Sequence, residues 1–140
     1  MTQNQISIHV KSVMRPETEQ AETIEFRTTG TYQEINDKTY LTYYEEHEMG
    51  KVKTVVKMSE KEIFVMRSGA IHMKQRFLIG ETTVTHYKMP FCTLQLDMHT
   101  HGIELDEENG LLHITYDMLT GENQKHLHTL SISYKEDLRS

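Results

Sequence analysis

The sequence contains no tryptophan, only one cysteine and two prolines, and no long apolar run. A single cysteine, Cys92, cannot form an intramolecular disulfide, which argues against a disulfide-stapled secreted scaffold. No segment is long and apolar enough to span a bilayer, and the N-terminal stretch MTQNQISIHVKSVMR alternates polar with apolar residues, unlike a secretory signal. We therefore expect a cytoplasmic protein with no membrane partner, and we expect Cys92 to be a small buried residue.

Basic residues are also in short supply. The chain has 15 Lys and Arg against 21 Asp and Glu, for a net charge of −6. No block of Lys or Arg is interleaved with aromatic residues, as a nucleic-acid groove requires, so we expect no nucleic-acid partner. With 140 residues, 36% of them hydrophobic, the chain suits one globular domain over residues 1–140.

Helical periodicity is nearly absent, and period-two alternation takes its place along almost the whole chain. Runs with one apolar and one polar face begin at Ile6, Ile24, Leu94, Leu112 and Leu130. Within them, Leu96 and Ile114 fall on the apolar face and Thr115 falls on the polar face. Such runs are typical of antiparallel strands that bury a single side.

Turn signals separate these runs and predict about ten strand segments. Asn-Gly between two alternating runs is the strongest hairpin signal, because both residues tolerate positive φ. The signals are Pro16, Asn36-Asp37, Met49-Gly50, Ser59-Glu60, Ser68-Gly69, Gly80, Pro90, Asn109-Gly110 and Gly121-Glu122. A meander of this length leaves two exposed edges unless it closes on itself. We therefore predict an all-β fold, a closed antiparallel meander β-barrel of about 8–10 strands, with an open sandwich as the second choice.

A set of short motifs and single residues in the middle and C-terminal parts of the chain points to a known family. They are Arg67-Ser68-Gly69, Phe77, Gly80, Tyr87-Lys88-Met89-Pro90-Phe91, Thr100, Gly110 and Tyr116. With them the chain resembles the YwiB-like uncharacterised bacterial β-barrel proteins. One departure is Cys92, where the family often has glycine. The resemblance implies a calycin-like or lipocalin-like barrel and implies no activity. Ligand binding inside such barrels is an analogy at the level of the fold.

Two His-x-His pairs raise the question of a metal site, because residues two apart on a strand share a face. His126 and His128 have the parity of the apolar face, whereas His99 and His101 have the opposite parity. The two pairs then lie on opposite sides of the wall and cannot share one ion. A bulge near Gly102, where the apolar parity changes, would affect only His101. We predict no metal and no other cofactor.

The inward histidines need hydrogen-bond partners. If the turn at Gly121 spans three residues, His128 lies opposite Tyr116 and His126 lies opposite Met118. One interpretation is a polar barrel end satisfied by tyrosines and water. The sharper one makes His126, His128 and Tyr116 polar contacts for a ligand. Arg67 is a further candidate whose direction the pattern leaves open, and it either pairs with a glutamate at the rim or contacts an anionic group of the ligand.

No arrangement of residues indicates catalysis, so we assign no catalytic residues. Glu45, Glu46 and Glu48 follow a strand that we expect to run out into solvent, and no spacing fixes a partner carboxylate for a glycosidase pair. Neither a Ser-His-Asp order nor a nucleophile elbow is present.

The function remains unknown at this point. The favoured hypothesis is a small cytoplasmic barrel that binds a small, partly apolar molecule at one end through His126, His128, Tyr116 and Arg67. The alternatives are a structural or protein-interaction barrel with a packed interior and, less favoured, an enzyme of undetermined chemistry. The pattern leaves a protein partner or self-association open.

Overall fold

Strands form all the regular structure in the described part of the chain. The computed structural model describes residues 3–16, 20–59, 61–120 and 124–136. The strands are β1 (Gln3–Pro16), β2 (Glu22–Ile35), β3 (Lys38–His47), β4 (Gly50–Met58), β5 (Glu62–Gly69), β6 (Met73–Leu78), β7 (Thr82–Lys88), β8 (Thr93–Asp106), β9 (Leu111–Thr120) and β10 (Gln124–Glu136). The described residues include no helix with the length and apolarity needed to cross a membrane.

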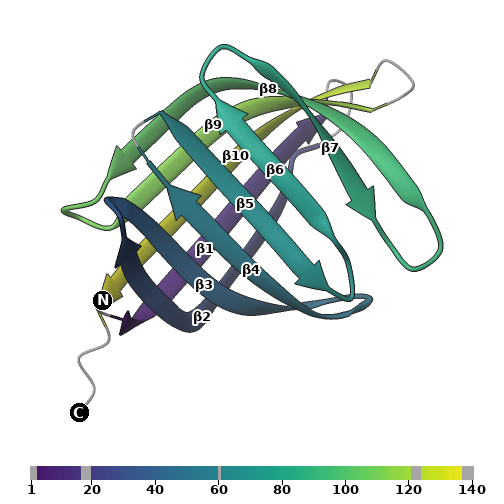
Figure 1. Cartoon of the computed structure of the whole chain (residues 1–140). Coiled ribbons are helices and arrows are strands. Elements are labelled where there is room, and N and C mark those ends of the chain that lie inside the picture. Colours follow the sequence, from purple (N-terminus) through teal and green to yellow (C-terminus); the bar gives the residue numbers. More distant parts are fainter. Residues whose placement is uncertain (1–2, 17–19, 60, 121–123, 137–140) are drawn as a thin grey trace.

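The ten strands form one antiparallel sheet in the order β6-β5-β4-β3-β2-β1-β10-β9-β8-β7. Strands that are consecutive in the chain pair with one another, except β6 and β7, and the β1–β10 ladder joins the two halves (Figure 1). An isolated bridge between His72, just before β6, and Lys88 of β7 links the two edges of the sheet. The sheet is thus a nearly closed barrel, which confirms the predicted antiparallel meander.

Period-two alternation buries one face of the wall, as predicted. Leu96 and Ile114 are 6% and 0% exposed and point into the barrel, whereas Thr115 faces outward. Two residues of the predicted apolar faces are not buried: Ile24 is 66% exposed and Leu94 is 49% exposed. Both lie near a strand end, where neighbouring strands no longer cover them. The β2–β3 ladder, for example, ends at the Gly30–Tyr43 pair.

The turns fall where the breaks were predicted, except where they lie outside the described residues. Asn36 and Asp37 have φ of 51° and 66° and make the tight hairpin between β2 and β3. Gly121-Glu122 and Glu60 are not among the described residues. Cys92 corrects our expectation, because it lies exposed in the loop between β7 and β8 instead of being buried.

A β-bulge interrupts the β8–β9 ladder between Thr100 and Gly102. It lies where the apolar parity changes in the sequence, and Ile103 beyond it packs against the core. The extra residue, His101, stays on the outer face of the wall, where it is exposed.

Candidate functional site

One end of the barrel carries a concentration of inward polar side chains, and we call it the polar end. It is the end where β3, β5, β7 and β9 finish and where β4, β6 and β10 begin. The inward polar residues there, on β3, β4, β5, β9 and β10, are Glu45, Thr54, Arg67, Tyr116, His126 and His128. All four of the predicted ligand residues are in this set.

His128 and Tyr116 form the centre of the β9–β10 side of the polar end. The register pairs His128 with Tyr116 and His126 with Met118, as predicted. The His128 and Tyr116 rings are stacked, with centroids 5.1 Å apart and planes 22° apart. On its other side Tyr116 contacts Phe77, with ring centroids 4.8 Å apart. The arrangement is a continuous aromatic layer with His128 at its end.

Burial sets the protonation states of this layer. Desolvation and, to a smaller extent, the neighbouring His126 lower the pKa of His128 to about 4, and Asp117 opposes the change. Burial also raises the pKa of Tyr116 to about 12, and nearby Arg67 and Gln75 reduce this rise. At neutral pH both groups are therefore uncharged, and each can donate or accept a hydrogen bond.

Arg67 points into the barrel, which settles the direction that the sequence left open. It follows the buried Ile63 and Val65 on the same face of β5. Its Nη2 lies 3.5 Å from Glu45 Oε1, and the same oxygen accepts a hydrogen bond from Thr54 Oγ1 at 2.7 Å. The result is an inward ion pair anchored on the fully buried Thr54.

Sequence reasoning missed the role of β3 at the polar end. The side chain of Glu45 is only 14% exposed, although we expected this acidic segment to run into solvent. His47, two residues on, lies 2.9 Å from the Tyr87 hydroxyl through its Nε2. A signal was present, because Glu45 and His47 share the parity of the buried Leu41 and Tyr43.

Three of the four predicted ligand residues hold a buried nitrogen without a hydrogen-bond partner in the described part of the chain. These atoms are Arg67 Nε, His126 Nδ1 and His128 Nε2. Buried polar atoms are nearly always satisfied by protein, water or a ligand, so each of them needs a partner. The polar end is thus able to present one donor and two imidazole nitrogens to a bound molecule.

The other His-x-His pair lies on the outer face, opposite the inward pair, as predicted. His101 Nε2 is 2.6 Å from Asp117 Oδ2, and Lys125 Nζ approaches the same oxygen at 3.3 Å. Burial alone would raise the pKa of Asp117, but the bonds from His101 and Lys125 outweigh it and the pKa is lowered. His99 is bonded to Thr82 Oγ1 at 2.9 Å. Within the described ranges, no group of three His, Cys, Asp or Glu side chains is placed to hold a metal ion.

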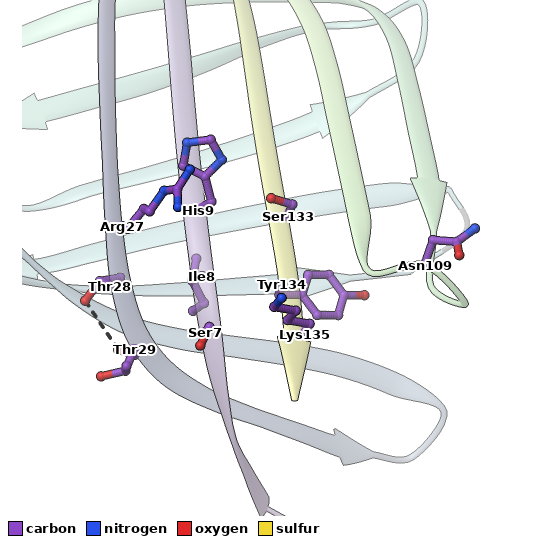
Figure 2. A pocket seen from close by; sticks show the side chains of 10 residues that line it. All are labelled: Ser7, Ile8, His9, Arg27, Thr28, Thr29, Asn109, Ser133, Tyr134 and Lys135. Carbon is purple, nitrogen blue, oxygen red and sulfur yellow. Dashed lines mark hydrogen bonds between the residues drawn. The ribbon is translucent and has the colours of Figure 1, made fainter. Parts of the chain in front are cut away.

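Hollows also open on the outer surface, and one of them reaches Arg67 of the polar end. Figure 2 shows one of about 830 Å³ over β2, β1 and β10, lined by Ser7, Ile8, His9, Arg27, Thr28, Thr29, Asn109, Ser133, Tyr134 and Lys135. Short hydroxyl side chains form much of this hollow, and His9 is already bonded to Glu25 at 2.6 Å. A second hollow, of about 500 Å³, lies over the seam between β6 and β7.

Comparison with known proteins identifies the family. A family described as a domain of unknown function, DUF1934, matches residues 8–132. The chain belongs to this family. It is 53% identical over 132 residues to the uncharacterised β-barrel protein YwiB of Bacillus subtilis (strain 168), covering 93% of this chain and 92% of that protein. The crystal structure of the Bacillus subtilis ywiB protein superposes with a TM-score of 0.87 at 50% identity, covering 96% of this chain and 93% of that one. The family resemblance stated from the sequence is confirmed. The function of the DUF1934 family is unknown, so membership identifies the fold and no activity.

Proposed function

We propose that the protein binds a small, partly apolar molecule at the polar end, between the His128–Tyr116 stack and the Arg67–Glu45 pair. The observation that carries this proposal is the set of buried nitrogens on Arg67, His126 and His128 that have no hydrogen-bond partner among the described residues. Leaving a buried polar group unsatisfied costs about 1–3 kcal/mol. Three such groups at one end of the barrel favour an occupant with complementary polar atoms.

The chemistry of the polar end constrains that occupant. Arg67 Nε is a donor only, so the molecule needs an acceptor oxygen or nitrogen on that side. Because Glu45 already lies 3.5 Å from Arg67, a carbonyl is sufficient and a second full negative charge is not required. The stacked faces of Tyr116 and His128 suit a flat or apolar body.

We place the access route at the break between β2 and β3. Residues 22–29 of β2 pair with β1, while the ladder to β3 covers only Gly30–Ile35. Phe26 and Tyr43 face each other across this break with ring centroids 6.2 Å apart. At this break two aromatic side chains take the place of backbone hydrogen bonds. Such a contact opens at a lower free-energy cost than a continuous ladder, so a ligand can enter there.

This proposal places the chain with the calycin-like barrels, on fold-level analogy. We also propose that the partner is a small molecule, not nucleic acid or a membrane, and that the protein is cytoplasmic. The single cysteine and the net charge of −6 support these choices.

A structural barrel without a ligand is the second candidate. It is favoured by tight packing of the rest of the interior, where Leu41, Met58, Ile63, Phe77 and Leu112 are almost completely buried. In that case water would satisfy the three nitrogens at the polar end.

Binding of a neutral apolar dye, Nile red, separates the two candidates. Wild-type protein should bind the dye with enhanced fluorescence, and His128→Ala should bind it about tenfold more weakly, which is about 1.4 kcal/mol. The matched control is His113→Ala, because His113 faces outward on β9 and bonds Ser131 Oγ at 2.8 Å. No binding by wild type, or equal binding by all three proteins, would support the structural barrel.

A further inference from the structure

The seam between β6 and β7 is a weak point of the wall and carries a hollow on its outer face. Among the described residues, the backbone bridge across the seam is that of His72 and Lys88, which exchange hydrogen bonds of 2.9 and 2.8 Å, and Thr83 Oγ1 on β7 donates a further bond of 2.7 Å to the Arg76 carbonyl on β6. The hollow over this bridge has a volume of about 500 Å³. That volume is in the range of pockets that hold small molecules.

The charge of this hollow is unlike that of the whole chain. Lys53, Lys74 and Lys88 line it together with His72 and His86, and no Asp or Glu is among its lining residues. Arg67 also lines the hollow and is paired with Glu45, whereas the other ion pairs among the described residues use His9, Arg76, His101 and Lys125. In a chain of net charge −6, this hollow holds three lysines without a carboxylate in its lining.

The same hollow has an apolar strip beside the lysines. The register aligns Val55 on β4 with Met66 on β5, and Met66 with Lys74 on β6. Val84 on β7 adds a side chain that is 54% exposed on the far side of the seam. The lining of the hollow is therefore apolar in one part and positively charged in another.

From this combination we propose that the seam hollow binds a small amphipathic anion, a carboxylate, sulfonate or phosphate attached to an apolar body. The ammonium groups would contact the anionic group, and Val55, Met66 and Val84 would cover the apolar body. Like charges at close range disfavour one another, so an anion placed among them relieves repulsion as well as gaining attraction. Arg67 lines this hollow and also belongs to the proposed ligand site at the polar end, so the two sites adjoin at that residue, while the three lysines are exposed on the outer face.

Calorimetric titration with 1-naphthalenesulfonate tests this inference, with 1-naphthylmethanol as the uncharged comparator. Wild type should bind the sulfonate, bind the alcohol at least fivefold more weakly, and lose sulfonate affinity as salt is raised. Lys53→Gln and Lys74→Gln should each weaken sulfonate binding about fivefold or more. The matched control, Lys57→Gln, removes a lysine on the same face of β4 that lies over the Tyr40 ring, outside the hollow, and should bind as wild type does.

Several results would overturn the inference. They are absence of sulfonate binding, equal affinity for the alcohol, an equal loss in Lys57→Gln, and a loss in His128→Ala as large as that in Lys74→Gln. Binding of a single-stranded oligonucleotide without binding of the sulfonate would assign the lysines to a different partner. Circular dichroism and thermal unfolding of the lysine variants check that exposed substitutions leave the fold intact.

Discussion

His128 is the residue where burial has its clearest chemical consequence. Desolvation lowers the pKa of its imidazole from 6.5 to about 4, with His126 adding to the effect and Asp117 opposing it. Between these two values the unfolded chain binds a proton that the folded protein does not bind. The contribution of His128 to stability is therefore complete above about pH 6.5 and is lost as pH falls toward 4.

The first prediction follows from this linkage. The free energy of unfolding of wild type, measured by urea denaturation, should fall between pH 7 and pH 4.5 more steeply than that of His128→Leu. The difference is at most about 3 kcal/mol, and less because the ring is partly exposed to solvent. His113→Leu, an outward histidine on β9, should keep the wild-type slope. Identical slopes for wild type and His128→Leu would show that His128 is not held neutral by burial.

Core packing supplies the second prediction. Leu96→Ala and Ile114→Ala should each lower the free energy of unfolding by roughly 2–5 kcal/mol, through lost burial and the cavity left behind. Thr115→Ala, on the outer face beside Ile114, should lower it by well under about 1 kcal/mol. Denaturant midpoints measure all three, and equal losses would contradict the inward and outward assignment.

At the residue scale, strand parity predicted some side-chain directions and missed others. It predicted that His126 and His128 point inward, because they alternate in step with the apolar residues of the same strand. It did not fix Arg67, since both faces of β5 are apolar in sequence and only the Glu45–Thr54 partners on β3 and β4 decide. The expectation that Cys92 is buried rested on its residue type and was wrong, because the exposure of a loop residue depends on which segments pack over it.

At the element scale, the β8–β9 turn depends on one glycine. Gly110 has a φ of 66°, and its carbonyl accepts a hydrogen bond from Tyr134 N at 2.8 Å. An added Cβ would overlap the Tyr134 carbonyl oxygen. The turn therefore needs glycine for two independent reasons, backbone conformation and close approach.

The third prediction compares two glycines of this hairpin. Gly110→Ala should lower the melting temperature by several degrees, because about 2 kcal/mol or more of strain and clash is introduced. Gly102→Ala should be close to neutral, since a Cβ there meets no atom within 4 Å. Equal melting temperatures of the two variants would contradict the assigned turn geometry.

The fourth prediction concerns the two His-x-His pairs, which the β8 and β10 strands place on opposite faces of the wall. Tag-free protein purified without chelator should contain far less than about one zinc, nickel or copper ion per chain, because neither pair has the ligands that complete a coordination shell among the residues that the structure describes. Elemental analysis by mass spectrometry measures this. Stoichiometric metal that disappears when both pairs are changed to alanine would contradict the prediction.

At the scale of the whole molecule, closure was predictable and its weak point was not. A sequential meander of about ten strands must hide its edges, so the sequence favoured a barrel. How completely it closes depends on the lengths and tilts of β6 and β7, which local alternation does not encode. The break between β2 and β3 and the seam between β6 and β7 both come from that global geometry. We propose the break as the access route to the polar end and the seam as a second binding site.

Native mass spectrometry tests the proposed ligand site at the polar end most directly. Tag-free protein isolated from its own cells should carry an additional small-molecule mass at up to one per chain, which is released by organic solvent. His128→Ala should carry clearly less of it, while the outward control His113→Ala should match wild type. A wild-type spectrum with the mass of the bare chain alone, together with absence of Nile red binding, would contradict ligand binding and leave a structural barrel.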